Sequence, residues 1–142
     1  PIDNAKTFYM YSTGEQTACI EAQIAIKTKT YNIFVTHLGN TGDPSQFAQI
    51  SEILARVKGK SNVILMGDFN FERFSEHYNL TTEVLDDSWL LKWPTGRDDK
   101  GNYPISAGIG KIFVSPGTEV IDSEYFSGMH SDTPALKAEI TL

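Results

Sequence analysis

The run at residues 62–69, Asn-Val-Ile-Leu-Met-Gly-Asp-Phe, constrains the fold of this chain more than any other feature of the sequence. It is an apolar run of strand length, which is the pattern expected when both faces of a strand are buried. We therefore expect a central strand that is covered on both sides. Because alternate residues point to opposite faces, one face carries Val63, Leu65 and Gly67, and the other carries Ile64, Met66 and Asp68.

Two further strands are expected before this run. Residues 17–26 and 31–38 are dense in β-branched and aromatic residues, and the short polar link at residues 27–30 suits a turn. This arrangement predicts adjacent strands joined as a hairpin. The single cysteine, Cys19, lies in the first of them and has no partner for a disulfide or a cysteine-rich metal site. We expect it to pack as a small hydrophobe.

A helix is expected over residues 43–58. Asp43 offers an N-cap, Pro44 takes the first helical position and Gln46 follows three residues after the cap, which together form a capping box. Gly59 ends the helix in a residue type that tolerates positive φ. The apolar stripe expected to face a sheet consists of Phe47, Ile50, Ile53, Leu54 and Val57.

The second half of the chain is less regular. Between residues 70 and 103 the periodicity fades, with a short helix expected near residues 74–80 and turns from residue 94 to 104. Two more strands are expected at residues 109–115 and 135–142. This order predicts an α+β fold with a mainly antiparallel sheet and helices on one face. Residues 1–142 have the length of a single domain.

Charge and hydropathy narrow the classes of function. The net charge of −6 and the pI of 4.9 argue against a general polyanion binder, so we expect no strong nucleic-acid binding. The loop at residues 92–100 mixes basic and acidic side chains, and we expect it to be solvated. No run reaches the ~18 apolar residues of a membrane span, and no signal peptide pattern precedes the first strand. The chain begins at Pro1 without a methionine, so we expect a piece of a longer protein, with its localisation open.

Three places in the sequence could carry chemistry. Asp68 and Asn70 end the central run two residues apart, so they point the same way and could bind a hard cation and a phosphate oxygen. The same pattern is also typical of an Asx turn. His37 ends an expected strand, where it could meet a phosphate or serve a structural role. Asp132 precedes the last strand, as a second carboxylate or as part of a turn.

In this order, the segments THLG, VILMGDFN, DDSW, IFVSPG and SD-x-PAL resemble the C-terminal half of the endonuclease/exonuclease/phosphatase superfamily. Deoxyribonuclease I, exonuclease III, neutral sphingomyelinase and the inositol polyphosphate 5-phosphatases belong to it. The resemblance covers residues 15–140 and implies a deoxyribonuclease I-like α/β sandwich, of which this chain holds about half the layers. It also implies a Mg²⁺- or Mn²⁺-dependent phosphoesterase. The implied catalytic positions are His37, Asp68, Asn70 and Asp132, and the last three are the implied metal ligands.

The chain departs from the family pattern at positions that the family uses for acid/base catalysis and phosphate binding. Thr133 stands where the closing SDH motif has its acid/base histidine, and a threonine does not titrate near neutrality. His130 lies three residues too early to replace it, because strand residues three apart point to opposite faces. Gly110 replaces the aspartate that orients this histidine, and Thr17 stands where a phosphate-binding arginine is frequent. Glu21 lies in the hairpin and is expected to be structural.

These departures favour a degenerate domain that is catalytically impaired and serves binding or assembly within a longer protein, with membrane attachment open through absent segments. General acid/base groups alone contribute ~10²–10⁴-fold to catalysis, so we expect their loss to leave little activity. The alternative is an active Mg²⁺-dependent phosphodiesterase or phosphatase, completed by a missing N-terminal half and acting on a small or lipid-borne phosphate ester. An unrelated α+β binding protein is the third hypothesis. In every case one sheet face lacks a covering helix, so we expect a homodimer or the missing half to cover it.

Overall fold

The structure of the chain is a computed structural model that describes residues 1–104, 108–126, 131 and 133–142. One mixed sheet has the strand order β1-β2-β3-β4-β6-β5, and β7 and β8 pair in a second, antiparallel sheet. The strands are β1 (Ile2–Tyr9), β2 (Ala18–Ile26), β3 (Lys29–His37), β4 (Val63–Asp68), β5 (Asp86–Asp87), β6 (Gly110–Val114), β7 (Val120–Phe126) and β8 (Ala135–Ile140). The helices are α1 (Gln46–Val57), α2 (Glu76–Thr82) and α3 (Ser88–Lys92).

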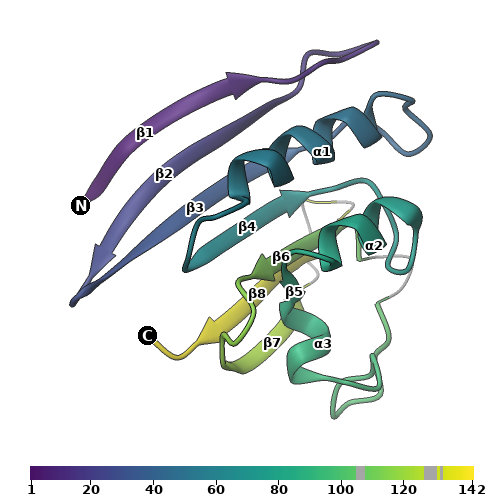
Figure 1. The fold of residues 1–142 in the computed structure, drawn as a ribbon. Helices are drawn as coiled ribbons and strands as arrows, with labels where there is room; N and C mark the ends of the chain where they lie inside the picture. The colour runs from purple at the N-terminus through teal and green to yellow at the C-terminus, as the bar shows by residue number, and fades with distance from the viewer. Residues whose placement is uncertain (105–107, 127–130, 132) are drawn as a thin grey trace.

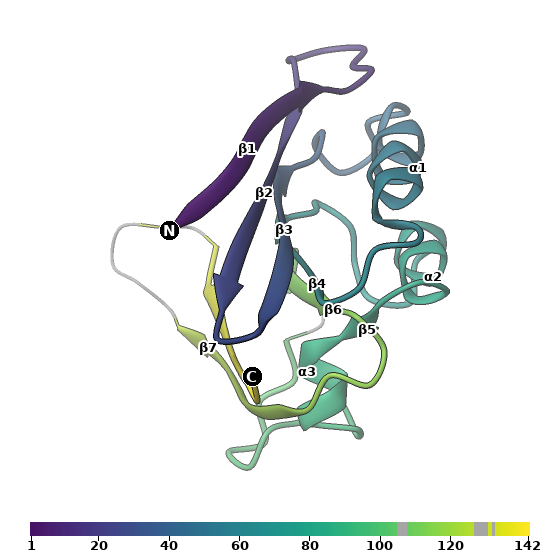
Figure 2. The ribbon, with the colours of Figure 1, turned by 60° about the vertical axis from the view of Figure 1, so that its left-hand side comes forward.

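These elements form layers on the two faces of the larger sheet. Helices α1 and α2 lie on one face, and β7 and β8 lie on the other (Figure 1, Figure 2). Strand β8 contacts β6, and α3 contacts both β6 and β7. Within the larger sheet the β3–β4 pair is parallel, and the other pairs are antiparallel. The α+β fold with a mainly antiparallel sheet is therefore confirmed, and no helix among the described residues is long and apolar enough to cross a membrane.

The expected central strand is β4, which pairs with β3 on one side and β6 on the other. Its Val63 and Leu65 are fully buried under the helices, where Leu65 lies level with Phe34 and Phe113. Ile64 and Met66, on the opposite face, are only half-buried. The two faces of this strand therefore differ: one belongs to the main core, and the other is only partly covered.

Helix α1 is present, but its expected start is wrong. It begins after Ser45, whose side chain makes no capping hydrogen bond. Asp43 instead accepts hydrogen bonds from the backbone N–H and the hydroxyl of Ser45, so it stabilises the turn before the helix. Phe47 is also not part of the buried stripe, since it is exposed and contacts His77 edge-on. Ile50, Ile53, Leu54 and Val57 form the buried stripe as expected.

Four elements were not expected from the sequence, and one of them, β5, has only two residues. β1 is an exposed edge strand in which Phe8 alone is buried, so it lacks the alternation that identifies a half-buried strand. β7 shows no clear apolar alternation, and its buried residue is a serine, Ser123. α3 has only five residues, too few to show a helical period.

Candidate phosphate-ester site at the end of the central strands

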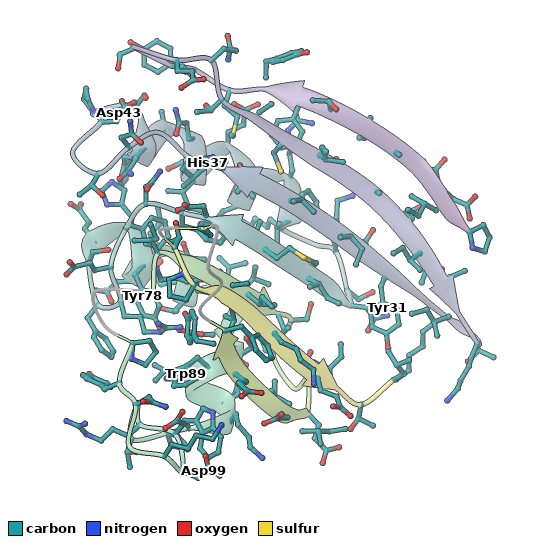
Figure 3. All side chains as sticks on the ribbon, turned by 180° about the vertical axis from the view of Figure 1, so that it is seen from behind. Tyr31, His37, Asp43, Tyr78, Trp89 and Asp99 are labelled. Carbon is teal, nitrogen blue, oxygen red and sulfur yellow. The ribbon has the colours of Figure 1, made fainter. Side chains whose placement is uncertain are left out.

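His37, Asp68 and Asn70 come together at one end of the larger sheet. The parallel register of β3 and β4 places His37 level with Asp68, with 3.8 Å between Nε2 and the carboxylate oxygen Oδ2. The amide nitrogen Nδ2 of Asn70 lies 3.3 Å from the same Nε2. His37 stands at the end of β3 in Figure 3, with its side chain 70% exposed. Three of the four implied site positions are therefore adjacent.

Asn70 is fixed by its own backbone and by β3. Its φ of 51° is left-handed, and its N–H donates to Oδ1 of Asp68 at 3.0 Å, which is an Asx turn. Its Nδ2 donates to the carbonyl of Leu38 at 3.0 Å. The structural role of this motif and its candidate chemical role therefore coexist, because the turn that satisfies the backbone also points the two side chains toward His37.

Gly67 allows the strands to approach at this point. Its φ is +148°, and a Cβ built on it would lie 1.8 Å from the carbonyl oxygen of Thr36 in the neighbouring strand. No other residue fits without moving β3 away from β4. The glycine that precedes Asp68 therefore sets the spacing between the strands that carry His37 and Asp68.

A buried lysine lies beneath the loop that follows Asn70. Lys111 is 1% exposed, and its Nζ donates to the carbonyls of Phe71 and Gly108. Burial, followed by the neighbouring guanidinium of Arg73, lowers the pKa of this amine to about 7. A lysine within a strand reads as solvent-exposed, so its sequence carried no signal for this role. It ties the loop after Asn70 to the start of β6.

A second buried network joins this loop to both sheets. Arg73 donates from Nε to Asp87 at 2.6 Å and from Nη2 to the hydroxyl of Tyr125 at 3.2 Å. Tyr78 donates to the same carboxylate at 3.0 Å, and Tyr125 donates to the carbonyl of Gly110 at 2.8 Å. Burial opposes the charge on Arg73, but the bonded carboxylate of Asp87 raises the pKa of the guanidinium overall. The DDSW segment, which supplies Asp87, was the available sequence signal.

The positions that depart from the family pattern lie next to Asp68. Gly110 pairs with Asp68 in the β4–β6 register, and a Cβ on it would have room, with the carbonyl oxygen of Pro134 at 3.7 Å. Thr133 borders the same space. Neither residue offers a group that titrates near neutrality. Asp132 and His130 lie outside the described residues, so their part in the site stays a prediction.

The structure also places three other residues that the sequence singled out, Glu21, Cys19 and Thr17. Glu21 is structural, because it is buried between the ammonium groups of Lys6 and Lys60 at 3.4 Å and 3.2 Å. Cys19 is fully buried, and burial raises the pKa of its thiol to about 12, which excludes it as a nucleophile at neutral pH. Thr17 lines a pocket of about 460 Å³ beside His37 together with Glu15 and Asp43, so this side of His37 is acidic.

The donor set fits a magnesium ion only in part. Across the ranges that the structure describes, no three His, Cys, Asp or Glu side chains come together as a metal site. Asp68 offers one carboxylate, and Asn70 offers its amide oxygen. Mg²⁺ accepts one or two carboxylates when waters and a substrate phosphate complete its shell. If the ion bound here, Asp68 and Asn70 would hold it, and it would polarise a phosphate oxygen.

The sheet order, the helices on one face and the cluster of His37, Asp68 and Asn70 define a partial deoxyribonuclease I-like sandwich. Solved structures of endonuclease/exonuclease/phosphatase proteins match it. With one from Beutenbergia cavernae the TM-score is 0.79 at 16% identity, over 100% of this chain and 45% of that one. With one from Leptotrichia buccalis the TM-score is 0.76 at 20% identity, over 100% of this chain and 62% of that one.

A mannosyl-6-phosphatase from Bacteroides thetaiotaomicron also matches, with a TM-score of 0.71 at 18% identity over 99% of this chain and 67% of that one. This chain therefore spans between 45% and 67% of the length of these three structures. The sequence matches no protein-family model and no curated protein. The fold expected from the sequence segments is confirmed: the chain has the fold of part of an endonuclease/exonuclease/phosphatase domain.

Proposed function

We propose that this chain is a degenerate endonuclease/exonuclease/phosphatase-like domain, catalytically impaired and used for assembly within a longer protein. The observation that carries the proposal is the pair of small residues beside Asp68. Gly110 lies level with Asp68 on the neighbouring strand, and Thr133 borders the same space. In the family pattern these two positions hold an aspartate and the histidine it orients. A phosphoesterase of this type needs a group there that moves a proton, and neither residue can do so.

On the β7–β8 side of the larger sheet, the part that carries β1, β2 and β3 has no described helix or strand over it, which supports a role in assembly. Ile20 and Val35, neighbours on this face of β2 and β3, are 48% and 39% exposed, and Ile2 on β1 is 68% exposed. Figure 3 shows β1, β2 and β3 from this side without a helix or strand in front of them. Soluble monomers seldom expose contiguous apolar patches larger than a few hundred Å². A second copy of this chain or an N-terminal half outside this sequence would cover the face.

Light scattering combined with charge reversal on this face tests the assembly role. Val35→Glu places a charge on this face, and Thr28→Glu places the same charge in the exposed β2–β3 turn as a control. If a second copy covers the face, the chain is a dimer, Val35→Glu makes it a monomer and the control stays dimeric. If an N-terminal half covers it, the isolated chain is a monomer that binds a hydrophobic dye. A monomer that binds no dye contradicts the assembly role.

An active Mg²⁺-dependent phosphodiesterase or phosphatase is the second candidate. The convergence of His37, Asp68 and Asn70 favours it, because these are the positions that would meet a phosphate and a metal ion. The acidic pocket beside His37 favours a small or lipid-borne phosphate ester over a long polyanion, and the similar structure from Bacteroides thetaiotaomicron is a mannosyl-6-phosphatase. Such activity would require acid/base groups from outside the described residues.

A further inference from the structure

The space beside Asp68 is a recess between the two sheets, on the face of the larger sheet opposite the helices. Its volume is about 340 Å³, within the ~300–1,000 Å³ typical of small-molecule sites. The larger sheet contributes Val35, Met66 and Ile112, and the second sheet contributes Leu136. We call this space the inter-sheet recess.

The glycine at position 110 opens the inter-sheet recess. Gly110 faces it, and the nearest atom to a Cβ built there would be 3.7 Å away, so the strand itself would tolerate a side chain. An aspartate at this position would fill part of the recess and bring a second carboxylate. With glycine, the recess has an apolar floor, and Asp68 is the acidic group among its described lining residues.

The charges around the recess select the kind of ligand it can hold. Among the residues that the structure describes, Asp68 and Lys111 are the ionisable ones in its lining. Lys111 alternates with Gly110 and Ile112 along β6, so its side chain points to the opposite face, where its ammonium donates to Phe71 and Gly108. Asp68 has one oxygen bonded to the N–H of Asn70, and its other oxygen lies 3.8 Å from His37, beyond hydrogen-bond reach.

We propose that the inter-sheet recess binds a small organic cation with an apolar body, such as an arylalkylamine. The apolar body packs among Val35, Met66, Ile112 and Leu136, and the ammonium group pairs with Oδ2 of Asp68, the oxygen that does not accept from Asn70. An organic anion of the same shape meets the Asp68 carboxylate, and the one cation among the described lining residues, Lys111, points to the opposite face, so the recess disfavours the anion. This ligand class differs from the phosphate ester of the second candidate function, and the proposal depends on neither candidate.

Two-dimensional amide NMR titration of the 142-residue chain tests the proposal, with phenethylamine as the cation and phenylacetate as the anion of similar shape. We expect phenethylamine to bind with a dissociation constant on the order of 1 mM, with shifts centred on the recess residues. Phenylacetate is expected to bind at least about tenfold more weakly, because its charge repels Asp68.

Three variants sharpen the test. Asp68→Asn removes the charge at constant shape and should weaken phenethylamine binding at least about threefold. Asp99→Asn changes the net charge equally in the exposed loop and should leave binding unchanged. Gly110→Ile should fill the recess and abolish binding. If this variant does not fold, the difference in phenethylamine binding between Asp68→Asn and Asp99→Asn tests the proposal. Equal binding of amine and anion, equal binding by Asp68→Asn and the parent chain, or shifts away from the recess would overturn the proposal.

Discussion

The buried ammonium of Lys111 predicts an unusual dependence of stability on pH. Its pKa is lowered from the ordinary 10.5 to about 7 in the folded chain, chiefly by burial. Between these two values the unfolded chain holds a proton that the folded chain does not, so unfolding takes up a proton and stability rises with pH. Below about pH 7 both states hold the proton, and the folded state bears the full free-energy cost of burying the charged amine. This cost lowers the free energy of unfolding by about 5 kcal/mol near pH 6 and by about 1.5 kcal/mol near pH 9.5.

Lys111→Met removes this cost together with two hydrogen bonds. The carbonyls of Phe71 and Gly108 lose their donor, at about 1–3 kcal/mol each at any pH. The variant should therefore be clearly less stable than the parent near pH 9.5 and close to it near pH 6. The gap between the two stabilities should change by between about 3 and 4 kcal/mol across this range.

Urea unfolding of both proteins at several pH values measures this gap, and the other titrating groups cancel in the difference. Asp68, Glu72, Arg73 and Asp87 all act on the charge of Lys111 and are unchanged in the variant. Lys58→Met, at an exposed lysine after α1, serves as the control and should show a gap that does not vary with pH. A constant gap for Lys111→Met as well would refute the depressed pKa and with it the account of this buried lysine.

Three further predictions concern the site and its support. Gly67→Ala should cost at least about 3 kcal/mol of unfolding free energy, because its Cβ would overlap the carbonyl of Thr36 at a φ that alanine rarely adopts; an ordinary loss below about 1 kcal/mol in urea unfolding would contradict this. Arg73→Met should cost about 3–5 kcal/mol by leaving the carboxylate of Asp87 buried without its cation, and a stability equal to the parent would show that the pair is not buried in solution. Calorimetry should detect weak Mg²⁺ binding or none, and micromolar affinity that disappears in Asp68→Ala would contradict the incomplete donor set.

Much of the fold was predictable because long apolar patterns determine it. The structure contains the expected hairpin, the helix that follows the hairpin, and the central strand within residues 62–69. The β1 strand was not predictable, because its side chains are almost all exposed and its pairing with β2 comes from backbone hydrogen bonds. The helix start was also wrong, since Asp43 satisfies a turn rather than the first helical N–H groups. Local capping patterns do not distinguish these two uses of an aspartate.

The sequence predicted which residues form the candidate site, but not the buried charged residues that support it. His37, Asp68 and Asn70 were expected, and the parallel register of β3 and β4 brings them together. The buried cations Lys111 and Arg73 were missed, because charged side chains are almost never fully buried unless they are paired, and their partners lie far away in sequence. Long-range pairing of this kind appears only in the folded chain.

Hydrolysis of a nitrophenyl phosphodiester with Mg²⁺ or Mn²⁺ tests the central claim most directly. We predict no turnover above background for the parent chain, because Gly110 and Thr133 supply no proton-transferring pair beside Asp68. Gly110→Asp combined with Thr133→His should not suffice to restore it, since the chain spans only between 45% and 67% of the length of the similar structures. Turnover by the parent chain that is abolished by both Asp68→Ala and His37→Ala would contradict the claim and establish an active phosphoesterase.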